Sequence, residues 1–293
     1  PSSMGQVGDD PFYLLRENGF EIINNRYGRK LTEDEVIELA SDCVGIVAGV
    51  EPLTSKVMDA LAKLKCISRV GVGMDSVDLD YAKQKGIIVV NTPDGPTRSV
   101  AEMTLAMTLS LLRKIPQADA NIKKGIWKKE TGNLLFGKTI GVIGLGRIGK
   151  MVAQTFSALG NEVLGYDLYP DNEWAKQFHV ELVEIDALIQ KSDIVTIHIP
   201  PAKDKTPILG KSHLNMLKET AFLINAARGG VVDEKALTRA LESGKLSFAG
   251  LDVFEQEPPV YEDILKLNNV SLSPHIGAST QEAQQRIGVE MAE

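Results

Sequence analysis

The sequence predicts an α/β protein that contains a doubly wound parallel sheet and a second, smaller α/β domain. Two observations predict this class. Short apolar runs typical of buried strands alternate with helical segments through nearly the whole chain. The length of 293 residues is that of about two domains of roughly 150 residues each. Strands that alternate with helices form parallel sheets whose faces are covered by helices.

The first part of the chain is predicted to alternate helices and strands. We expect helices at 10–18, 32–40 and 54–61, and strands at 20–24, 44–50, 66–70 and 87–90. Thr32 is followed three residues later by Glu35, which is the pattern of a capping box at a helix start. The chain has no apolar strand before its first helix and stops within a helical pattern at 280–293. We therefore expect an opening strand and a closing helix to lie outside this sequence.

Two prolines and a glycine at 91–96 predict a hinge or domain boundary. We expect residues 1–93 with 275–293 to form the smaller domain and residues 94–274 the larger one. The helix expected at 97–112 is apolar on most of its circumference, so it is predicted to be buried inside one chain or between two. Strands of the larger domain are expected at 139–143, 162–166, 194–199, 221–225, 247–252 and 270–273.

A glycine-rich loop joins the strand at 139–143 to the next predicted helix. Its glycines are Gly144, Gly146 and Gly149, in the spacing GxGxxG. The first permits a tight turn, the second lets the backbone approach a pyrophosphate, and the third lets helix and strand pack closely. The free N–H groups at the helix start would bind the phosphates. This arrangement predicts a Rossmann dinucleotide-binding domain; FAD, S-adenosylmethionine or a glycine turn without ligand are the alternatives.

The strand after this loop ends at Asp167, which predicts the kind of dinucleotide. A carboxylate in that place accepts hydrogen bonds from ribose hydroxyls and repels a 2′-phosphate. The next residues, Leu168, Tyr169 and Pro170, include no Arg or Lys. The sequence therefore predicts NAD rather than NADP.

Further candidate residues follow the other strands of the larger domain. Arg228 has small neighbours and can fork onto a carboxylate or polarise a carbonyl oxygen. His275 suits proton transfer near neutral pH, and Glu257 could orient its ring and favour the imidazolium form. Alone, each is more often a surface charge or a structural residue. In parallel sheets the strand ends share one edge, so we expect a site there. The candidates are Asp167, His198, Ile199, Pro200, Arg228, Asp252, Glu257 and His275.

Together these residues predict one reaction. A nicotinamide gives or takes hydride at a carbon atom, the histidine gives or takes the hydroxyl proton, and the arginine holds the substrate. That set of roles is the interconversion of a 2-hydroxy acid and a 2-keto acid.

Four stretches of the chain carry a resemblance to a known family. They are the loop Gly144–Gly149 and the segments 225–233, 251–259 and 273–280. The chain resembles the D-isomer-specific 2-hydroxyacid dehydrogenases over nearly its whole length, and is most similar to their D-3-phosphoglycerate dehydrogenase branch. The resemblance implies a Rossmann domain, a smaller flavodoxin-like substrate domain, and a homodimer built around the helix at 97–112.

The resemblance also implies roles for single residues. Arg228, Glu257 and His275 would be the catalytic trio. The loop 69–75 would bind the substrate carboxylate, because successive N–H groups near glycines form an anion nest. The implied substrate contacts are Arg69, Val70, Gly71, Val72 and Arg228. The implied NAD contacts are Val72, Arg147, Ile148, Asp167, Ala226, Ala227, Arg228, Asp252, His275, Gly277 and Ala278.

Two positions depart from the family pattern. Phosphoglycerate enzymes of the human type carry an arginine that reads the phosphate in the loop after the second strand, where this chain has Ala48-Gly49-Val50-Glu51. Family members often carry Asn where this chain has Pro96. Arg69 and Arg98 are other sources of positive charge. The substrate thus stays open between 3-phosphoglycerate, glyoxylate or hydroxypyruvate, another keto acid, and formate or phosphite.

Composition excludes other classes. Hydrophobic residues make up 43% and charged residues 24%, the proportions of a globular protein, and a net charge of −7 disfavours nucleic acid. The apolar stretch at 103–112 is too short to span a membrane. Four histidines without an HExxH pattern predict no metal site. Cys43 and Cys66, far apart in a long chain, favour the reducing cytoplasm.

A role without catalysis is the alternative from a different class. Some relatives of the family act as dimeric, NAD-sensing transcriptional co-regulators. The complete trio Arg228, Glu257 and His275 favours an enzyme. Oxidation of NADH with a panel of keto acids distinguishes the two.

Overall fold

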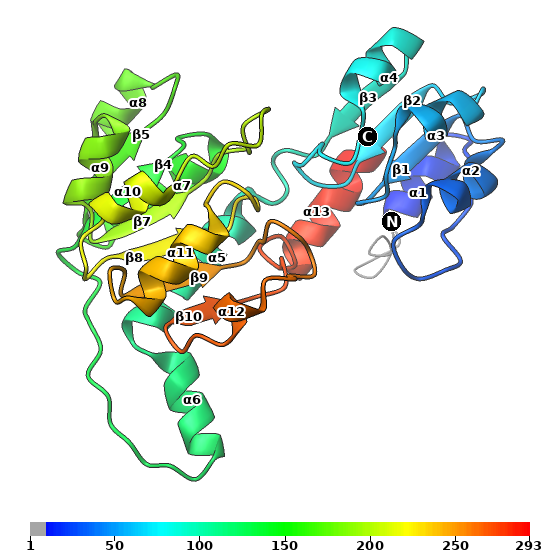
Figure 1. Ribbon diagram of the computed structural model, residues 1–293. Coiled ribbons are helices and arrows are strands. Elements are labelled where there is room, and N and C mark those ends of the chain that lie inside the picture. Colours follow the sequence, from blue (N-terminus) through cyan, green and yellow to red (C-terminus); the bar gives the residue numbers. More distant parts are fainter. Residues whose placement is uncertain (1–9) are drawn as a thin grey trace. The chain divides into compact units, whose positions relative to one another are not determined.

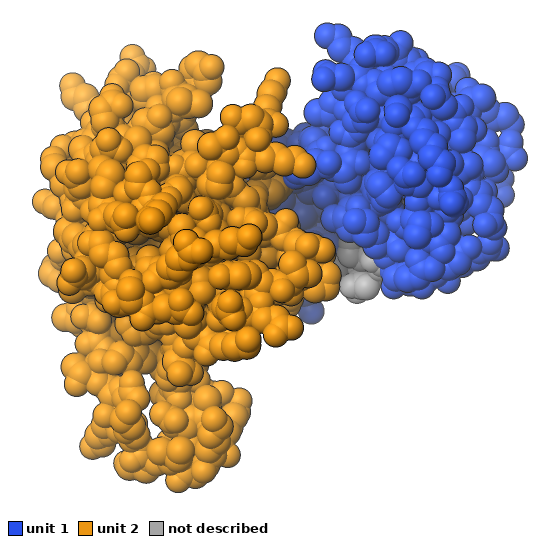
Figure 2. Space-filling model, in the orientation of Figure 1, with its two compact units in different colours: residues 1–97, 278–293 blue, residues 98–277 orange. Residues whose placement is uncertain are grey.

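The computed structural model describes residues 10–293, and the chain divides into two compact units (Figures 1 and 2). Unit 1 comprises residues 1–97 and 278–293, and unit 2 comprises residues 98–277. The boundaries predicted from the sequence, after residues 93 and 274, lie a few residues before these. Unit 1 is thus assembled from two separate parts of the chain.

Unit 1 contains a three-stranded parallel sheet whose spatial order follows the sequence, β1-β2-β3. Its core gathers around the buried side chains of Leu53, Val57 and Ile67. The strands are β1 (Gly45–Ala48), β2 (Cys66–Arg69) and β3 (Ile88–Asn91). The helices are α1 (Asp10–Glu17), α2 (Glu33–Ala40), α3 (Ser55–Ala60), α4 (Leu79–Lys85) and α13 (Gln281–Ala292).

The strand predicted at 20–24 is wrong: this segment is irregular in the structure. Phe20 and Ile23 are about half exposed, and no described strand pairs with the segment. The alternation of apolar and polar residues resembles a strand. A strand forms, however, only where a neighbour takes up its N–H and C=O groups.

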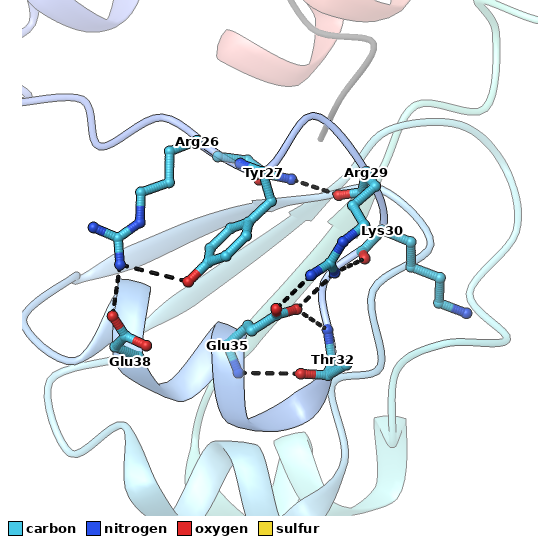
Figure 3. A network of polar contacts seen from close by, with 8 residues as sticks. Arg26, Tyr27, Arg29, Lys30, Thr32, Glu35 and Glu38 are labelled. Carbon is cyan, nitrogen blue, oxygen red and sulfur yellow. Dashed lines mark hydrogen bonds and ion pairs between the residues drawn. The ribbon is translucent and has the colours of Figure 1, made fainter.

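The predicted capping box at α2 is confirmed (Figure 3). The Glu35 amide donates to Thr32 Oγ1 at 3.4 Å, and Glu35 Oε2 accepts from the Thr32 amide at 2.9 Å. The Arg29 guanidinium forks onto both Glu35 oxygens, at 2.6 and 2.9 Å. These bonds lower the pKa of the Glu35 carboxyl to about 2, the Arg29 bond being the largest cause. The start of α2 is therefore fixed by local contacts that the sequence pattern predicts.

Unit 2 contains a seven-stranded, fully parallel sheet in the order β10-β9-β8-β7-β4-β5-β6. The order reverses between β4 and β7, which is the switch point where such sheets bind ligands. The strands are β4 (Thr139–Ile143), β5 (Glu162–Tyr166), β6 (Val180–Leu182), β7 (Ile194–Ile197), β8 (Phe222–Asn225), β9 (Phe248–Leu251) and β10 (Val270–Leu272). The helices are α5 (Thr97–Leu112), α6 (Ile115–Lys123), α7 (Arg147–Ala158), α8 (Asn172–Gln177), α9 (Ile185–Lys191), α10 (Lys211–Met216), α11 (Glu234–Glu242) and α12 (Glu262–Leu265).

The sheet of unit 2 is buried on both faces, as a doubly wound sheet must be. Along β4, Ile140 and Val142 pack into one apolar cluster and Ile143 packs into the other. Helices α5 and α7 contribute to the first cluster, and α9, α10 and α11 to the second. The sequence predicted this architecture but missed β6, whose three residues give no periodic signal.

Helix α5 has the bounds that the sequence predicts, and much of its apolar surface packs within its own unit. Met107, Leu111 and Leu112 are buried in the cluster beneath β4, whereas Leu109 is 39% exposed. The 16 residues of α5 are too few for a membrane span, and no helix in residues 10–293 has the length and apolarity that one requires.

Candidate active site

The glycine loop after β4 has the geometry that a phosphate-binding turn needs. Gly144 has φ +92°, and a Cβ on it would lie 2.6 Å from the His198 carbonyl oxygen. A Cβ on Gly149 would lie 1.8 Å from the Gly144 carbonyl oxygen. Neither position has room for a side chain, so the loop lies tightly between β4 and α7.

Gly146 differs from the two other glycines because a Cβ there would meet no atom within 4 Å. It is exposed and forms the N-cap of α7, with φ −71° and ψ −164°. Since neither packing nor conformation requires glycine there, the missing side chain leaves open space above the helix start. An N-terminus with free amides and open space above it fits the pyrophosphate of a dinucleotide. Arg147 and Ile148 begin the first turn of the same helix.

Asp167 lies directly after β5 and binds the glycine loop. Its Oδ2 accepts from the Leu145 amide at 2.7 Å, and its Oδ1 accepts from the Tyr169 amide at 2.9 Å. The carboxylate is half-buried and keeps further lone pairs for ribose hydroxyls. Leu168 and Tyr169 are exposed beside it, 75% and 90% respectively. Asp167 thus binds the glycine loop from the position where the sequence predicts the ribose of the cofactor.

His198 follows β7, the strand across the switch point from β4. Its Nε2 lies 2.9 Å from Thr196 Oγ1, whereas its Nδ1 is fully covered and has no partner among the described residues. Burial lowers the pKa of His198 to about 3, so the ring is neutral at physiological pH. Ile199 packs against Gly144, and Pro200 is exposed. The residue therefore adds a neutral polar ring next to the glycine loop.

Arg228 lies in a loop after β8 that Asn225 shapes. The Asn225 side chain accepts from the Ala227 amide at 3.1 Å and donates to the Arg228 carbonyl at 2.9 Å. Arg228 Nη1 donates to the Ala227 carbonyl at 2.7 Å, and the residue is half-buried. Ala226, on the strand side of the loop, is buried. Sequence reasoning missed the role of Asn225, although its position at the strand end was visible.

Glu257 and His275 meet in the structure, as the sequence proposed. His275 Nδ1 lies 2.8 Å from Glu257 Oε2, while Glu257 Oε1 accepts from the Phe254 amide at 3.2 Å. Both side chains are partly exposed. Contact through Nδ1 leaves Nε2 of the ring to face a substrate. The pair has the arrangement of a general acid–base group with its orienting carboxylate.

Asp252, buried at the end of β9, holds the backbone around His275. Its carboxylate accepts from the Ile276 amide at 2.9 Å, the Gly277 amide at 2.7 Å and the Ser273 hydroxyl at 2.6 Å. His275 itself has φ +53°, a left-handed conformation that is uncommon for residues other than glycine. The carboxylate that the resemblance places at NAD is therefore also a support of the candidate acid–base residue.

The loop after β2 in unit 1 differs from the simple anion nest that was expected. The Val70 amide donates to the Ala48 carbonyl at 2.8 Å, and the Gly71 amide donates to Thr92 Oγ1 at 2.7 Å. These two N–H groups are not available to an anion. Among the described residues, no hydrogen-bond acceptor is found for the amides of Val72 and Gly73. Of the N–H groups expected to bind the anion, these two are therefore the candidates that stay.

The neighbouring loop after β1 contains a buried carboxylate. Glu51 is 8% exposed, and its Oε2 accepts from the Gly49 amide at 2.7 Å. Arg69 ends β2 and donates through Nη1 to the Val70 carbonyl. Of the predicted substrate residues in unit 1, Arg69 is thus the cationic one, and the loop after β1 adds negative charge.

Fold and site together define a dinucleotide-binding α/β protein with an acid–base pair at the carboxyl edge of its larger sheet. The family model for the NAD-binding domain of D-isomer-specific 2-hydroxyacid dehydrogenases matches residues 105–277. The chain belongs to this family, and NAD is its cofactor.

The chain is similar to proteins of several organisms. It is 45% identical over 267 residues to a D-3-phosphoglycerate dehydrogenase of Methanocaldococcus jannaschii, covering 90% of this chain and 51% of that protein. A solved Thermus thermophilus structure is 33% identical, with a TM-score of 0.89 and coverage of 97% and 91%. A D-lactate dehydrogenase of Aquifex aeolicus, solved with NAD and lactic acid, is 33% identical, with a TM-score of 0.85 and coverage of 99% and 92%. The chain spans about half the length of the curated relatives that it matches.

Proposed function

We propose that the protein is an NAD-dependent oxidoreductase that interconverts a D-2-hydroxy acid and its 2-keto acid. The contact of 2.8 Å between His275 Nδ1 and Glu257 Oε2 carries this proposal. It lies in a unit whose glycine loop leaves space for a pyrophosphate above Gly146 and no room for side chains at Gly144 and Gly149. A purely NAD-sensing protein would need the loop but not the acid–base pair.

Each residue has a distinct role in this proposal. His275 Nε2 gives a proton to the keto oxygen during reduction and takes it from the hydroxyl during oxidation. Glu257 holds the ring by Nδ1 and stabilises the imidazolium. Arg228 binds the substrate carboxylate and carbonyl through its forked guanidinium, and Arg69 with the Val72 and Gly73 amides adds carboxylate binding from the loop after β2. Bound NAD supplies or accepts the hydride.

The geometry of the glycine loop and the family resemblance together support a proposal for the residues that hold NAD. The Gly146 cap and the amides of Arg147 and Ile148 bind the pyrophosphate, and Asp167 binds the ribose hydroxyls. The remaining NAD contacts in the proposal are Val72, His198, Ile199, Pro200, Ala226, Ala227, Arg228, Asp252, His275, Gly277 and Ala278.

Two classes of substrate are candidates, for different reasons. Relatives that are 42% and 45% identical to the chain carry the name D-3-phosphoglycerate dehydrogenase, which favours a phosphorylated acid. The loop after β1 has the buried Glu51 where phosphate recognition would want an arginine, which favours glyoxylate, hydroxypyruvate or another unphosphorylated keto acid. NADH oxidation measured with 3-phosphohydroxypyruvate, hydroxypyruvate, glyoxylate and pyruvate tests both. Turnover with none of them, despite NADH binding, favours the co-regulator role instead.

The homodimer predicted from the sequence remains a proposal, and the structure suggests which residues would take part. In addition to α5, helix α6 and the loop between α6 and β4 expose apolar side chains. Ile122 is 54% exposed, Trp127 83% and Leu134 74%. We propose that a second copy of the chain covers them. Sedimentation analysis should show dimers for the wild type and monomers for Trp127→Glu with Ile122→Glu.

Two further proposals concern the partners of the protein and its location in the cell. The net charge of −7 disfavours nucleic acid as a partner. Cys43 and Cys66 are free thiols, and burial raises the pKa of both, so neither is a reactive thiolate at neutral pH. Unpaired cysteines are typical of a reducing compartment, and the cytoplasm is therefore the proposed location.

A further inference from the structure

Two glutamates that the mechanism does not use bind each other's backbone amides next to the acid–base pair. Glu255 Oε1 accepts from the Glu234 amide at 3.3 Å, and Glu234 Oε1 accepts from the Glu255 amide at 2.5 Å. Glu234 is the first residue of α11, and Glu255 lies in the loop after β9, two residues before Glu257. The reciprocal bonds join the start of a helix to the loop that bears Glu257.

The same loop is also fixed by close backbone packing. A Cβ on Gly229 would lie 1.8 Å from the Phe254 carbonyl oxygen, so the loop that follows Arg228 packs directly on residue 254. The Phe254 amide in turn donates to Glu257 Oε1. Bonds at residues 254, 255 and 257 therefore leave this short loop little freedom. Without the bonds between Glu234 and Glu255, this loop loses its connection to the start of α11 and keeps its packing against Gly229.

Glu234 lies where a negative charge is unfavourable, because its side chain is buried. The residue is only 7% exposed, and burial is the largest cause that raises the pKa of its carboxyl. The charges of Glu255 and Glu257 raise this pKa further, against the bond from the Glu255 amide. A buried carboxylate beside two others costs folding free energy unless hydrogen bonds compensate it. Even when it is protonated, the carboxyl group keeps an oxygen that can accept from the Glu255 amide.

We propose, on the basis of the proposed dehydrogenase function, that Glu234 and Glu255 form a clamp that positions Glu257 against His275. Glu234 is a positioning residue in this proposal because it acts through the loop and does not touch substrate. The clamp keeps Glu257 Oε2 at Nδ1 while the substrate enters and leaves. Loss of the clamp lets Glu257 move away, and the imidazolium form of His275 loses its partner.

Other charged groups surround the clamp and are to be kept constant. Asp233 caps α11 by accepting from the Ala236 amide at 2.9 Å, and Lys235 lies in the same turn. Helices α10 and α12 pack against α11. The first carries Lys211 and His213, and the second carries Glu262 and Asp263. None of these is changed in the test except Asp233, which serves as the control.

The test compares Glu234→Ala, Glu234→Gln and Asp233→Ala in the whole chain. Glu234→Ala should lower kcat of keto-acid reduction about fivefold or more, and should move the upper pH limb of kcat about half a pH unit or more downward. Glu234→Gln keeps an acceptor oxygen for the Glu255 amide and should restore both. Asp233→Ala loses only the helix cap, so it should lower Tm without moving the limb.

A second readout does not depend on activity. The sequence has four histidines, so His275 can be assigned in NMR spectra by comparison with His275→Gln. The pH midpoint of its ring signals should fall in Glu234→Ala and return in Glu234→Gln. This holds even if the wild type turns over none of the keto acids, which would contradict the proposed function but not the clamp.

The proposal is overturned if Glu234→Ala lowers Tm like Asp233→Ala but moves neither the limb nor the midpoint. If Glu234→Ala does not fold, Glu255→Ala decides the question, because Glu255 is exposed and its loss removes the other half of the clamp. A shift in the same direction supports the clamp, and an unchanged midpoint overturns it.

Discussion

A methyl group on Gly149 would lie 1.8 Å from the carbonyl oxygen of Gly144. The start of α7 therefore packs directly on the backbone of the loop that follows β4. Gly146, between the two, has no such restriction, because open space surrounds its missing side chain. Two of the three glycines thus serve packing, and the third serves the ligand.

Gly149→Ala and Gly146→Ala should therefore fail in different ways. The first should lose about 3 kcal/mol or more of unfolding free energy, because backbone atoms must move to admit the methyl group. The second should keep the wild-type Tm but bind NADH about tenfold or more weakly, since the methyl group occupies the space of the pyrophosphate. Thermal unfolding and fluorescence titration measure both. Equal loss of stability in the two variants would contradict this assignment.

Asp167 should make NADH bind about tenfold or more tightly than NADPH, because its carboxylate accepts from the ribose hydroxyls of NADH and repels the 2′-phosphate of NADPH. Asp167→Asn should reduce this preference, and its single oxygen can still accept from one of the two amides, of Leu145 or of Tyr169, that the carboxylate binds. Fluorescence titrations with both dinucleotides measure the ratio. Equal affinities in the wild type would exclude Asp167 as the selecting residue.

His275→Ala should lower kcat by about 10²- to 10⁴-fold, the usual contribution of a positioned proton donor. Glu257→Gln should shift the upper pH limb of keto-acid reduction to lower pH, since the imidazolium loses its carboxylate partner. His213→Ala, in the same unit but on α10, is the control and should retain wild-type kcat. A limb that does not move in Glu257→Gln would show that the contact has no catalytic role.

Arg228→Lys should lower kcat/KM by about tenfold to a hundredfold, although the charge is kept. An ammonium cannot fork onto two oxygens as the guanidinium does. Arg239→Lys, an exposed arginine on α11, is the matched control and should leave kcat/KM unchanged. Steady-state kinetics at saturating NADH decide the matter: an unaffected Arg228→Lys would remove Arg228 from the substrate site.

His198 should make the fold sensitive to acid. Its pKa is about 3 in the native chain, against about 6.5 for an ordinary histidine in an unfolded one. Below about pH 6.5 the unfolded chain therefore binds a proton that the native chain does not, and stability falls by up to about 1.4 kcal/mol per pH unit until the native pKa is reached. His198→Gln should lose less Tm than the wild type between pH 7 and pH 5. Equal losses would mean that the ring is protonated in the native state.

The sequence predicted the features that depend on neighbours in the chain. The capping box of Thr32 and Glu35, the glycine loop and the bounds of α5 are local patterns, and each is present as expected. The contact of Glu257 with His275 was proposed because neighbouring parallel strands end at one edge. Such predictions need only the order of elements.

Features that depend on a partner distant in the sequence were not predictable. The segment 20–24 has a strand pattern, but within residues 10–293 no strand pairs with it. The Gly71 amide is taken by the Thr92 hydroxyl, 21 residues away, so the expected anion nest is smaller. The mutual bonds of Glu234 and Glu255 likewise span 21 residues and follow no motif. In each case a contact between residues distant in the sequence decides which of several locally possible conformations or hydrogen bonds is formed.

The assembly of unit 1 from two parts of the chain has a consequence for folding during synthesis. Helix α13 packs against α1, where Gly288 admits Pro11, and Ser68 Oγ donates to the Met291 carbonyl. These contacts wait until all seven strands of unit 2 have left the ribosome, because α13 follows them in the chain. The part of unit 1 that precedes unit 2 therefore lacks its contacts with α13 until the inserted unit has been synthesised.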